Sequence, residues 1–270
     1  MYIIYVAFYG NRFADIALFP ADVILYYTGL VHNWKGVSGM KPFINNYEDI
    51  LELLDEKVHG VEWNRFYEDR ERPVPFITQN TIPDENLVFF LKKNPQIKSA
   101  VEFGCGEGRN AIYMAKQGIE VTAYDLSESA IENAKSIMAD TGVTVNFVCK
   151  NVIKSDVAGT FDFAYDSGMM HHLAPHRRLT YIEILRKILK PGGYFGLTCF
   201  AWGENCGEEM TDWEYYEHSQ NSGLAYTKER LEEIFQPYFK TVEIRKYENG
   251  IPDTIQGLQF MWTCLYQKED

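Results

Sequence analysis

From Ser99 onward, short strand-like apolar runs alternate with helix-like segments. The runs are SAVEF (99–103), IEVTAY (119–124), TVNFV (144–148), FDFAY (161–165), YFGLTCF (194–200), 240–247 and 258–267. The intervening helices are expected over 109–117, 127–139, 177–189 and 228–235. Strands separated by helices imply right-handed crossovers and a parallel sheet. The last two strands have only a short turn between them, so we predict an α/β fold with a doubly wound, mostly parallel seven-stranded sheet and an antiparallel edge hairpin.

The chain before this pattern divides into two parts. Residues 1–39 form an N-terminal extension whose status the sequence leaves open, and we hypothesise that Met40 is the biological start. Charged residues and Pro20 interrupt each apolar run, so no stretch reaches the ~18 uncharged residues of a membrane span. Residues 40–83 are expected to form a helical and irregular cap on the domain that covers 84–270.

Composition narrows the class of partner. The chain has 26 Lys and Arg against 38 Asp and Glu, a formal net charge of −12. Nucleic-acid binding needs a basic face that displaces counterions, so we expect a small-molecule partner and neither nucleic acid nor membrane. The five cysteines form no C-x-x-C pair, which favours reduced thiols in a cytoplasmic enzyme. Oligomeric state stays open.

The sharpest motif is the glycine-rich turn VEFGCGEGRN, residues 101–110. A dinucleotide fingerprint, G-x-G-x-x-G, would require glycine where Arg109 stands. The observed G-x-G-x-G, with an acid two residues before its first glycine, resembles motif I of class I S-adenosylmethionine-dependent methyltransferases. The resemblance implies a Rossmann-like fold and a loop that cradles the methionine part of S-adenosylmethionine. The implied cofactor contacts are Glu102, Gly104, Cys105, Gly106, Gly108 and Arg109.

The ends of the next two strands extend the same resemblance. Asp125 follows the glycine turn by about 20 residues, a spacing at which an acid can accept from both ribose hydroxyls. The alternative is that Asp125 or Ser127 only caps the next helix. We favour the ribose for Asp125, capping for Ser127, and a cofactor contact for Leu126. The resemblance implies adenine contacts from Asn151 and Val152, although Asn151 stands where the family often has an acid.

Two later landmarks occur in the family's order. Asp162 resembles its motif II acid, with a structural role, and Asp166 and Ser167 are implied to lie beside the sulfonium. The run LKPGG (189–193) resembles the post-II motif, although it can serve simply as a helix stop and turn. The resemblance covers roughly residues 84–270.

Several aromatic and histidine residues indicate an acceptor site. His171 and His172 follow the strand end nearest the expected sulfonium, and we hypothesise that one faces the acceptor as a catalytic residue. The DSG, HHL and PHRR runs (166–178) resemble bacterial small-molecule enzymes near the thiopurine, thiol and tellurite-resistance methyltransferases. In that group aromatic cap residues cover the site, here Trp63, Phe66 and Tyr67, which could equally pack a helix onto the sheet. The long insertion 201–225 adds Trp202 to the expected substrate contacts. His172 and His176 are four apart, but Pro175 lies between them, so we expect no metal site.

The sequence therefore predicts an S-adenosylmethionine-dependent methyltransferase with a small-molecule acceptor, a thiol or related soft nucleophile. An amine or hydroxyl acceptor and a non-catalytic S-adenosylmethionine-binding protein stay open as alternatives. A nicotinamide oxidoreductase is disfavoured by Arg109 and by the LKPGG run. The acceptor's identity is not predicted.

Overall fold

The computed structural model describes residues 43–58, 60–69, 74, 81–218 and 223–269, together with short strands between residues 3 and 19. The chain divides into two compact units, Met1–Leu53 and Leu54–Asp270. The first unit has two antiparallel strand pairs and most of α2; their bounds are β1 (Ile3–Tyr5), β2 (Phe8–Tyr9), β3 (Arg12–Phe13), β4 (Ala17–Phe19) and α2 (Tyr47–Asp55). The hypothesis that Met40 is the start falls on a residue outside the described ones.

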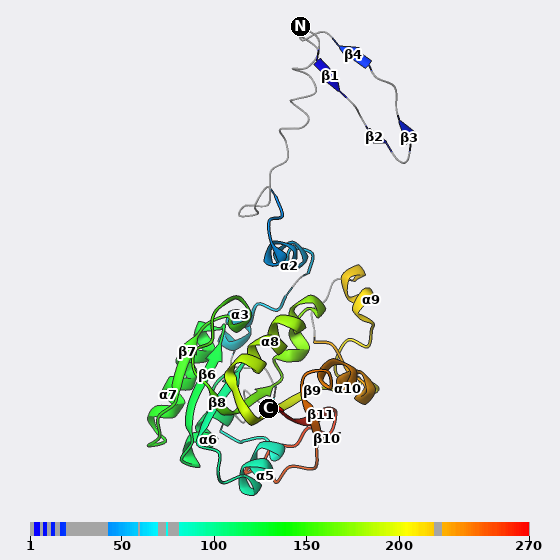
Figure 1. Cartoon of the computed structure of the whole chain (residues 1–270). Helices are drawn as coiled ribbons and strands as arrows, with labels where there is room; N and C mark the ends of the chain where they lie inside the picture. The colour runs from blue at the N-terminus through cyan, green and yellow to red at the C-terminus, as the bar shows by residue number, and fades with distance from the viewer. Residues whose placement is uncertain are drawn as a thin grey trace. The chain divides into compact units, whose positions relative to one another are not determined.

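The second unit is built on a seven-stranded sheet with the order β10-β11-β9-β8-β5-β6-β7 (Figure 1). Its strands are β5 (Ser99–Phe103), β6 (Glu120–Asp125), β7 (Asn146–Cys149), β8 (Phe161–Ser167), β9 (Leu189–Phe200), β10 (Lys240–Lys246) and β11 (Met261–Gln267). Strand β11 pairs antiparallel with both β9 and β10, and the other neighbours are parallel. The predicted fold class is confirmed.

Helices cover both faces of this sheet. The helices described in this unit are α3 (Trp63–Glu68), α5 (Glu85–Lys93), α6 (Arg109–Lys116), α7 (Glu128–Ala139), α8 (Arg178–Ile188), α9 (Asp212–Glu217) and α10 (Lys228–Phe235). Alternation along each strand feeds two cores: in β8, Ala164 packs with α8 and α10, whereas Phe163 and Tyr165 pack with α5, α6 and α7. Side chains of successive strand residues point to opposite faces, and both faces are buried under helices. The strands are therefore apolar at nearly every position.

One predicted turn is built differently. Residues 191–193 were expected to separate a helix from a strand, but β9 already begins at Leu189. Pairing with β8 shifts here: β8 advances from Phe161 to Phe163 while β9 advances from Leu189 to Tyr194. Gly192 has a φ of +71°. The Pro-Gly-Gly run therefore forms a bulge within β9 rather than a separate turn before it.

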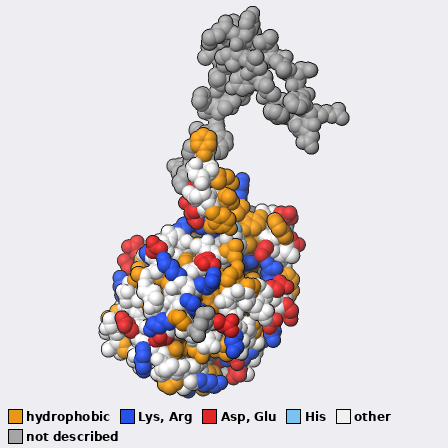
Figure 2. All heavy atoms as spheres, in the orientation of Figure 1, with side chains coloured by type: hydrophobic (Ala, Val, Ile, Leu, Met, Phe, Trp, Pro, Cys, Tyr) orange, Lys and Arg blue, Asp and Glu red, His pale blue; other side chains and the backbone are white. Residues whose placement is uncertain are grey.

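The surface of the second unit carries both signs of charge. On the face seen in Figure 2, acidic and basic side chains are interspersed rather than gathered into one basic area. Within the described part of the chain, no helix combines the length and the apolar character that crossing a bilayer demands.

Candidate active site

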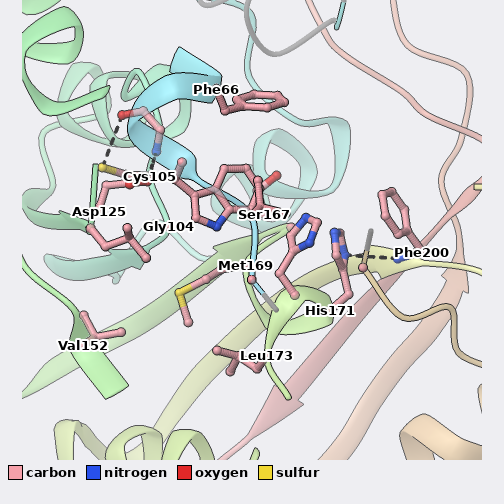
Figure 3. A pocket seen from close by; sticks show the side chains of 18 of the residues that line it. Phe66, Gly104, Cys105, Asp125, Val152, Ser167, Met169, His171, Leu173 and Phe200 are labelled. Atoms are coloured by element: carbon pink, nitrogen blue, oxygen red, sulfur yellow. Dashed lines mark hydrogen bonds between the residues drawn. The ribbon is translucent and has the colours of Figure 1, made fainter. Parts of the chain in front are cut away.

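A cavity of about 900 Å³ lies at the carboxyl ends of the central strands of the second unit. Its wall combines the loops after β5, β6, β7 and β8 with segments that follow β9 and precede β11. Doubly wound folds bind ligands at this edge, and the volume is typical of small-molecule sites. In Figure 3, Gly104 and Asp125 lie on one side of the cavity, and His171 and Phe200 on the other.

The glycine loop after β5 turns sharply and starts α6. Gly106 and Gly108 have φ values of +53° and +81°, which favour glycine. A Cβ atom on Gly106 would lie 2.6 Å from the Tyr67 hydroxyl, and one on Gly108 would lie 2.5 Å from the Phe147 ring. Gly106 lines the cavity together with the predicted contacts Gly104 and Cys105. Gly108, although predicted as a contact, lies outside the wall because it packs against Phe147.

Asp125 ends β6 beside this loop, and both of its carboxylate oxygens accept main-chain hydrogen bonds. Oδ2 accepts from the Gly106 N–H at 2.8 Å, and Oδ1 accepts from the Ser127 N–H at 2.9 Å. Each oxygen has two lone pairs, so each can accept one more hydrogen bond from a ligand. Burial raises the pKa of Asp125, and the main-chain hydrogen bonds oppose that rise. Ser127 caps α7 as predicted, since its Oγ accepts from the Ala130 N–H.

Arg109 lines the cavity with its guanidinium bound to Asp84, a buried residue that sequence reasoning missed. Arg109 contacts Asp84 Oδ1 at 2.5 Å and donates to Ser167 Oγ at 3.1 Å. Ser167 in turn donates to Asp84 Oδ2 at 2.6 Å. Burial raises the pKa of Asp84, but the Arg109 charge and these hydrogen bonds outweigh burial and hold it below its usual range. Asp84 follows Pro83 and is the N-cap of α5.

Glu102, near the end of β5, also contributes to the cavity wall. It is 1% exposed, and its Oε2 has no hydrogen-bond partner among the described residues. Burial raises the pKa of this carboxyl well above its usual range, although the nearby Arg109 opposes the rise. An unsatisfied buried oxygen costs free energy. A ligand that brings a hydrogen-bond donor to Glu102 would remove that cost.

The predicted adenine side is lined by Leu126, Asn151 and Val152. Asn151 Oδ1 accepts from the Ile153 N–H at 3.0 Å and thereby caps the short 3-10 helix η1 (Val152–Lys154). One lone pair of that oxygen remains for a ligand amino group. Leu126 is 50% exposed and offers an apolar surface at the rim.

Asp166 does not line the cavity, in contrast to the prediction that it lies beside the sulfonium. Its carboxylate accepts from the main-chain N–H groups of Met169 and Met170 at 2.7 and 3.0 Å, and from the Tyr181 hydroxyl at 2.7 Å. Burial raises the pKa of Asp166 to about 7. The side chain turns into the protein and holds the β8 exit, while Ser167 does line the cavity.

His171 and His172 lie on the 3-10 helix η2 (Met170–His172), and both line the cavity. The Phe200 N–H donates to His171 Nδ1 at 3.3 Å, so the proton of this imidazole belongs on Nε2. The His171 ring also stacks on the Phe200 ring, with centroids 3.9 Å apart. Burial lowers the pKa of His171 well below its usual range and that of His172 to about 4. Both rings are neutral at pH 7.

The cap helix α3 supplies three aromatic side chains to the wall: Trp63, Phe66 and Tyr67. The Trp63 ring meets the His172 ring edge-on, with centroids 4.8 Å apart. Asn64 Oδ1 accepts from Ser127 Oγ at 2.9 Å, which fixes α3 to the first turn of α7. The predicted aromatic cover is therefore part of the same compact unit as the sheet.

Trp202 does not line the cavity, contrary to the prediction. It follows the end of β9 by two residues and is 41% exposed. The insertion lines the cavity with Tyr215, one of its aromatic residues that could line an acceptor site. Sequence reasoning missed the other wall residues from Phe200 to the start of β11: Phe200, Glu204, Asn205, Cys206, Gly223, Tyr247, Leu258, Phe260 and Met261.

The two histidines considered for a metal site belong to separate 3-10 helices, η2 and η3 (Pro175–Arg177). His176 Nε2 lies 2.9 Å from Asp55 Oδ1, and its Nδ1 lies 2.8 Å from the Tyr216 hydroxyl. The described residues contain no group of three or more His, Cys, Asp or Glu side chains suited to a metal ion.

Comparison with known proteins identifies the domain around this cavity. Residues 100–193, from β5 to the Pro-Gly-Gly bulge, match the sequence model of the methyltransferase domain family. Within these residues the chain carries a methyltransferase domain. The resemblance predicted from the glycine turn is thereby confirmed.

Curated relatives of this methyltransferase domain cover only part of the chain. It is 22% identical to the probable S-adenosyl-L-methionine-dependent methyltransferase TehB of Haemophilus influenzae, over 54% of this chain and 56% of that protein. It is 31% identical to the ubiquinone biosynthesis O-methyltransferase of Coxiella burnetii, over 36% of this chain and 41% of that protein. The chain thus spans about half the length of the curated relatives it matches.

Among solved structures, the Burkholderia thailandensis 1,6-didemethyltoxoflavin-N1-methyltransferase aligns with a TM-score of 0.59 and 22% identity. The alignment covers 85% of this chain and 93% of that one. At this identity the likeness concerns the fold.

Proposed function

We propose that this protein transfers a methyl group from S-adenosylmethionine to a small-molecule acceptor. The observation that carries the proposal is that one cavity joins the glycine loop and Asp125 to a cluster of aromatic and histidine side chains. S-adenosylmethionine supplies a methyl group that is already activated on a sulfonium. The net charge of −12 supports a small acceptor rather than a nucleic acid, and the five free cysteines support a cytoplasmic setting.

The proposed cofactor contacts follow from the hydrogen-bond acceptors that the cavity wall offers to a ligand. The remaining lone pairs of Asp125 accept the two ribose hydroxyls, and the glycine loop cradles the methionine part. The unpaired oxygen of Glu102 accepts from the methionine ammonium. Leu126, Asn151 and Val152 surround the adenine.

The acceptor is a thiol or a related soft nucleophile. Methyl transfer requires an acceptor atom opposite the sulfur, ~3–3.5 Å from the methyl carbon, in a site without water. The Nδ1 lone pair of His171 is used by Phe200, and His172, with a pKa of about 4, is a weak base. A thiol with an ordinary pKa near ~8.5 needs no strong base, whereas a hydroxyl acceptor does.

Two measurements test this function. Calorimetry with S-adenosylmethionine, S-adenosylhomocysteine and NAD should show binding of the first two only. Transfer of a radiolabelled methyl group should then be found with thiols before amines or phenols. Binding of NAD alone would overturn the proposal in favour of an oxidoreductase. Cofactor binding without transfer to any acceptor class would indicate a binding protein instead.

The histidines provide a sharper test of acceptor chemistry. With a thiol acceptor, His172→Gln should change kcat by no more than about threefold, because no strong base is needed. A loss of 100-fold or more that is confined to kcat would show that His172 acts as a base, and would favour an amine or hydroxyl acceptor. The acceptor's KM, measured in the same assays, separates lost binding from lost chemistry.

A further inference from the structure

Lysine and arginine are unevenly distributed around the cavity wall. Its cations come from loops after the central and β7-side strands: Arg109 follows β5, Lys150 and Lys154 follow β7, and Arg177 follows β8. The described wall residues on the β9 and β11 side include no lysine or arginine; they are Phe200, Glu204, Asn205, Cys206, Tyr215, Gly223, Tyr247, Leu258, Phe260 and Met261. The β9 and β11 side of the cavity therefore lacks a cation among the described residues.

The cations of the other half are already engaged. Arg109 is bound to Asp84, as described above. Asp55 Oδ2 lies 2.6 Å from a terminal nitrogen of Arg177 and 2.8 Å from Lys154 Nζ. Lys150 Nζ donates to the Asp156 main-chain oxygen at 2.6 Å. These contacts hold the positive charges in place near the loops that carry them.

Among the described wall residues of the β9 and β11 side, Glu204 is the one that carries a carboxylate, and its side chain is 41% exposed. Its Oε1 accepts from Lys246 Nζ at 2.8 Å, and Lys246 itself lies outside the wall, 4.6 Å from the centre of the Trp262 ring. The imidazoles of His171 and His172 offer no positive charge at pH 7. An anion placed here would lose part of its hydration and gain no free opposite charge from the described residues, which is costly.

We propose that the β9 and β11 side of the cavity selects uncharged acceptors and excludes molecules that carry a carboxylate or phosphate. Glu204 is the specificity-determining residue, because its carboxylate holds Lys246 in an ion pair and so keeps this cation from an anionic acceptor. This inference rests on the proposed function and names the charge class of its acceptor.

A matched pair of probes tests the inference. The two thiols 4-mercaptobenzamide and 4-mercaptobenzoate have nearly the same shape, and they differ by one negative charge. Calorimetry in the presence of S-adenosylhomocysteine, and kcat/KM in methyl transfer, should both favour the amide by at least about 100-fold, the scale of an unpaired charge removed from water. Equal values within about threefold would overturn the inference, and so would failure of both thiols to bind.

Glu204→Gln should reduce the preference for the amide over the carboxylate by about three- to tenfold, because it frees Lys246 for the carboxylate of the probe. The matched control is Glu217→Gln, an exposed acid of α9 outside the wall, which should leave the ratio unchanged. An unchanged ratio in Glu204→Gln would remove Glu204 from the proposal. Affinity for S-adenosylhomocysteine is measured in the same samples, so loss of the proposed function is recognised separately from loss of acceptor selectivity.

Discussion

The two halves of the cavity are built from different parts of the chain. The half around the glycine loop uses residues that directly follow β5, β6 and β7, and Asp125 is held by main-chain N–H groups. The opposite half combines the cap helix α3, the exit of β8, the insertion after β9 and the segment before β11. Local turn geometry therefore fixes the first half, whereas packing between distant segments fixes the second. Substitutions in the first should alter cofactor binding, and those in the second should alter acceptor binding.

The largest effect is expected from Asp125→Ala. This change removes both proposed ribose contacts and the acceptor for the Gly106 N–H, so affinity for S-adenosylhomocysteine should fall by at least about 100-fold in calorimetry. Glu128→Gln, an exposed neighbour in the first turn of α7, is the control and should bind normally. Undiminished affinity in Asp125→Ala would contradict the division of the cavity.

A smaller loss is expected from Gly106→Ala. Its left-handed backbone costs about 1–2 kcal/mol with a side chain, and the new methyl group would meet the Tyr67 hydroxyl, so affinity should fall by about tenfold or more. Adding Tyr67→Phe should restore part of this loss, because it removes the hydroxyl that the methyl group meets.

Gly142→Ala is the matched control for this pair. Gly142 also has a positive φ, +73°, but no atom lies within 4 Å of the position that a Cβ atom would take there. It should lower the melting temperature without changing cofactor affinity. If Tyr67→Phe restores nothing in the Gly106 variant, the backbone alone sets the requirement for glycine.

The smallest effect is expected in the acceptor half. Trp63→Ala should raise the KM of an aromatic thiol by about tenfold through lost ring contacts, and should change S-adenosylhomocysteine affinity by less than about twofold. Trp213→Ala is the control, since Trp213 is 83% exposed on α9 and lies outside the wall. A larger effect of Trp63→Ala on cofactor affinity than on KM would show that α3 belongs to the cofactor half.

Local patterns predicted the first half of the cavity well. Apolar runs and helix caps located every strand and most helices of the sheet unit to within a few residues, apart from the start of β9, because each signal is local. The glycine turn and Asp125 follow strand ends, and parallel strands bring such ends to one edge. The placement of both beside one cavity was therefore predictable, whereas their contacts with a cofactor stay predictions.

The second half of the cavity depends on contacts that local sequence patterns do not predict. Asp84 meets Arg109 across 25 residues of sequence, and no periodicity links them. Phe200 lines the cavity while Trp202 does not, because side-chain direction beyond the end of a strand depends on the turn that follows. Asp166 was expected at the cofactor, yet it faces inward to main-chain donors that only the folded loop creates.

The insertion of β11 between β9 and β10 has a consequence for synthesis of the chain. Until residues 261–267 emerge from the ribosome, β10 has no neighbouring strand to pair with, and β9 presents an open edge. The same residues deliver Met261 to the cavity wall. The glycine loop is therefore synthesised well before β11, and the cavity wall on the β9 side is completed only when β11 has paired with β9.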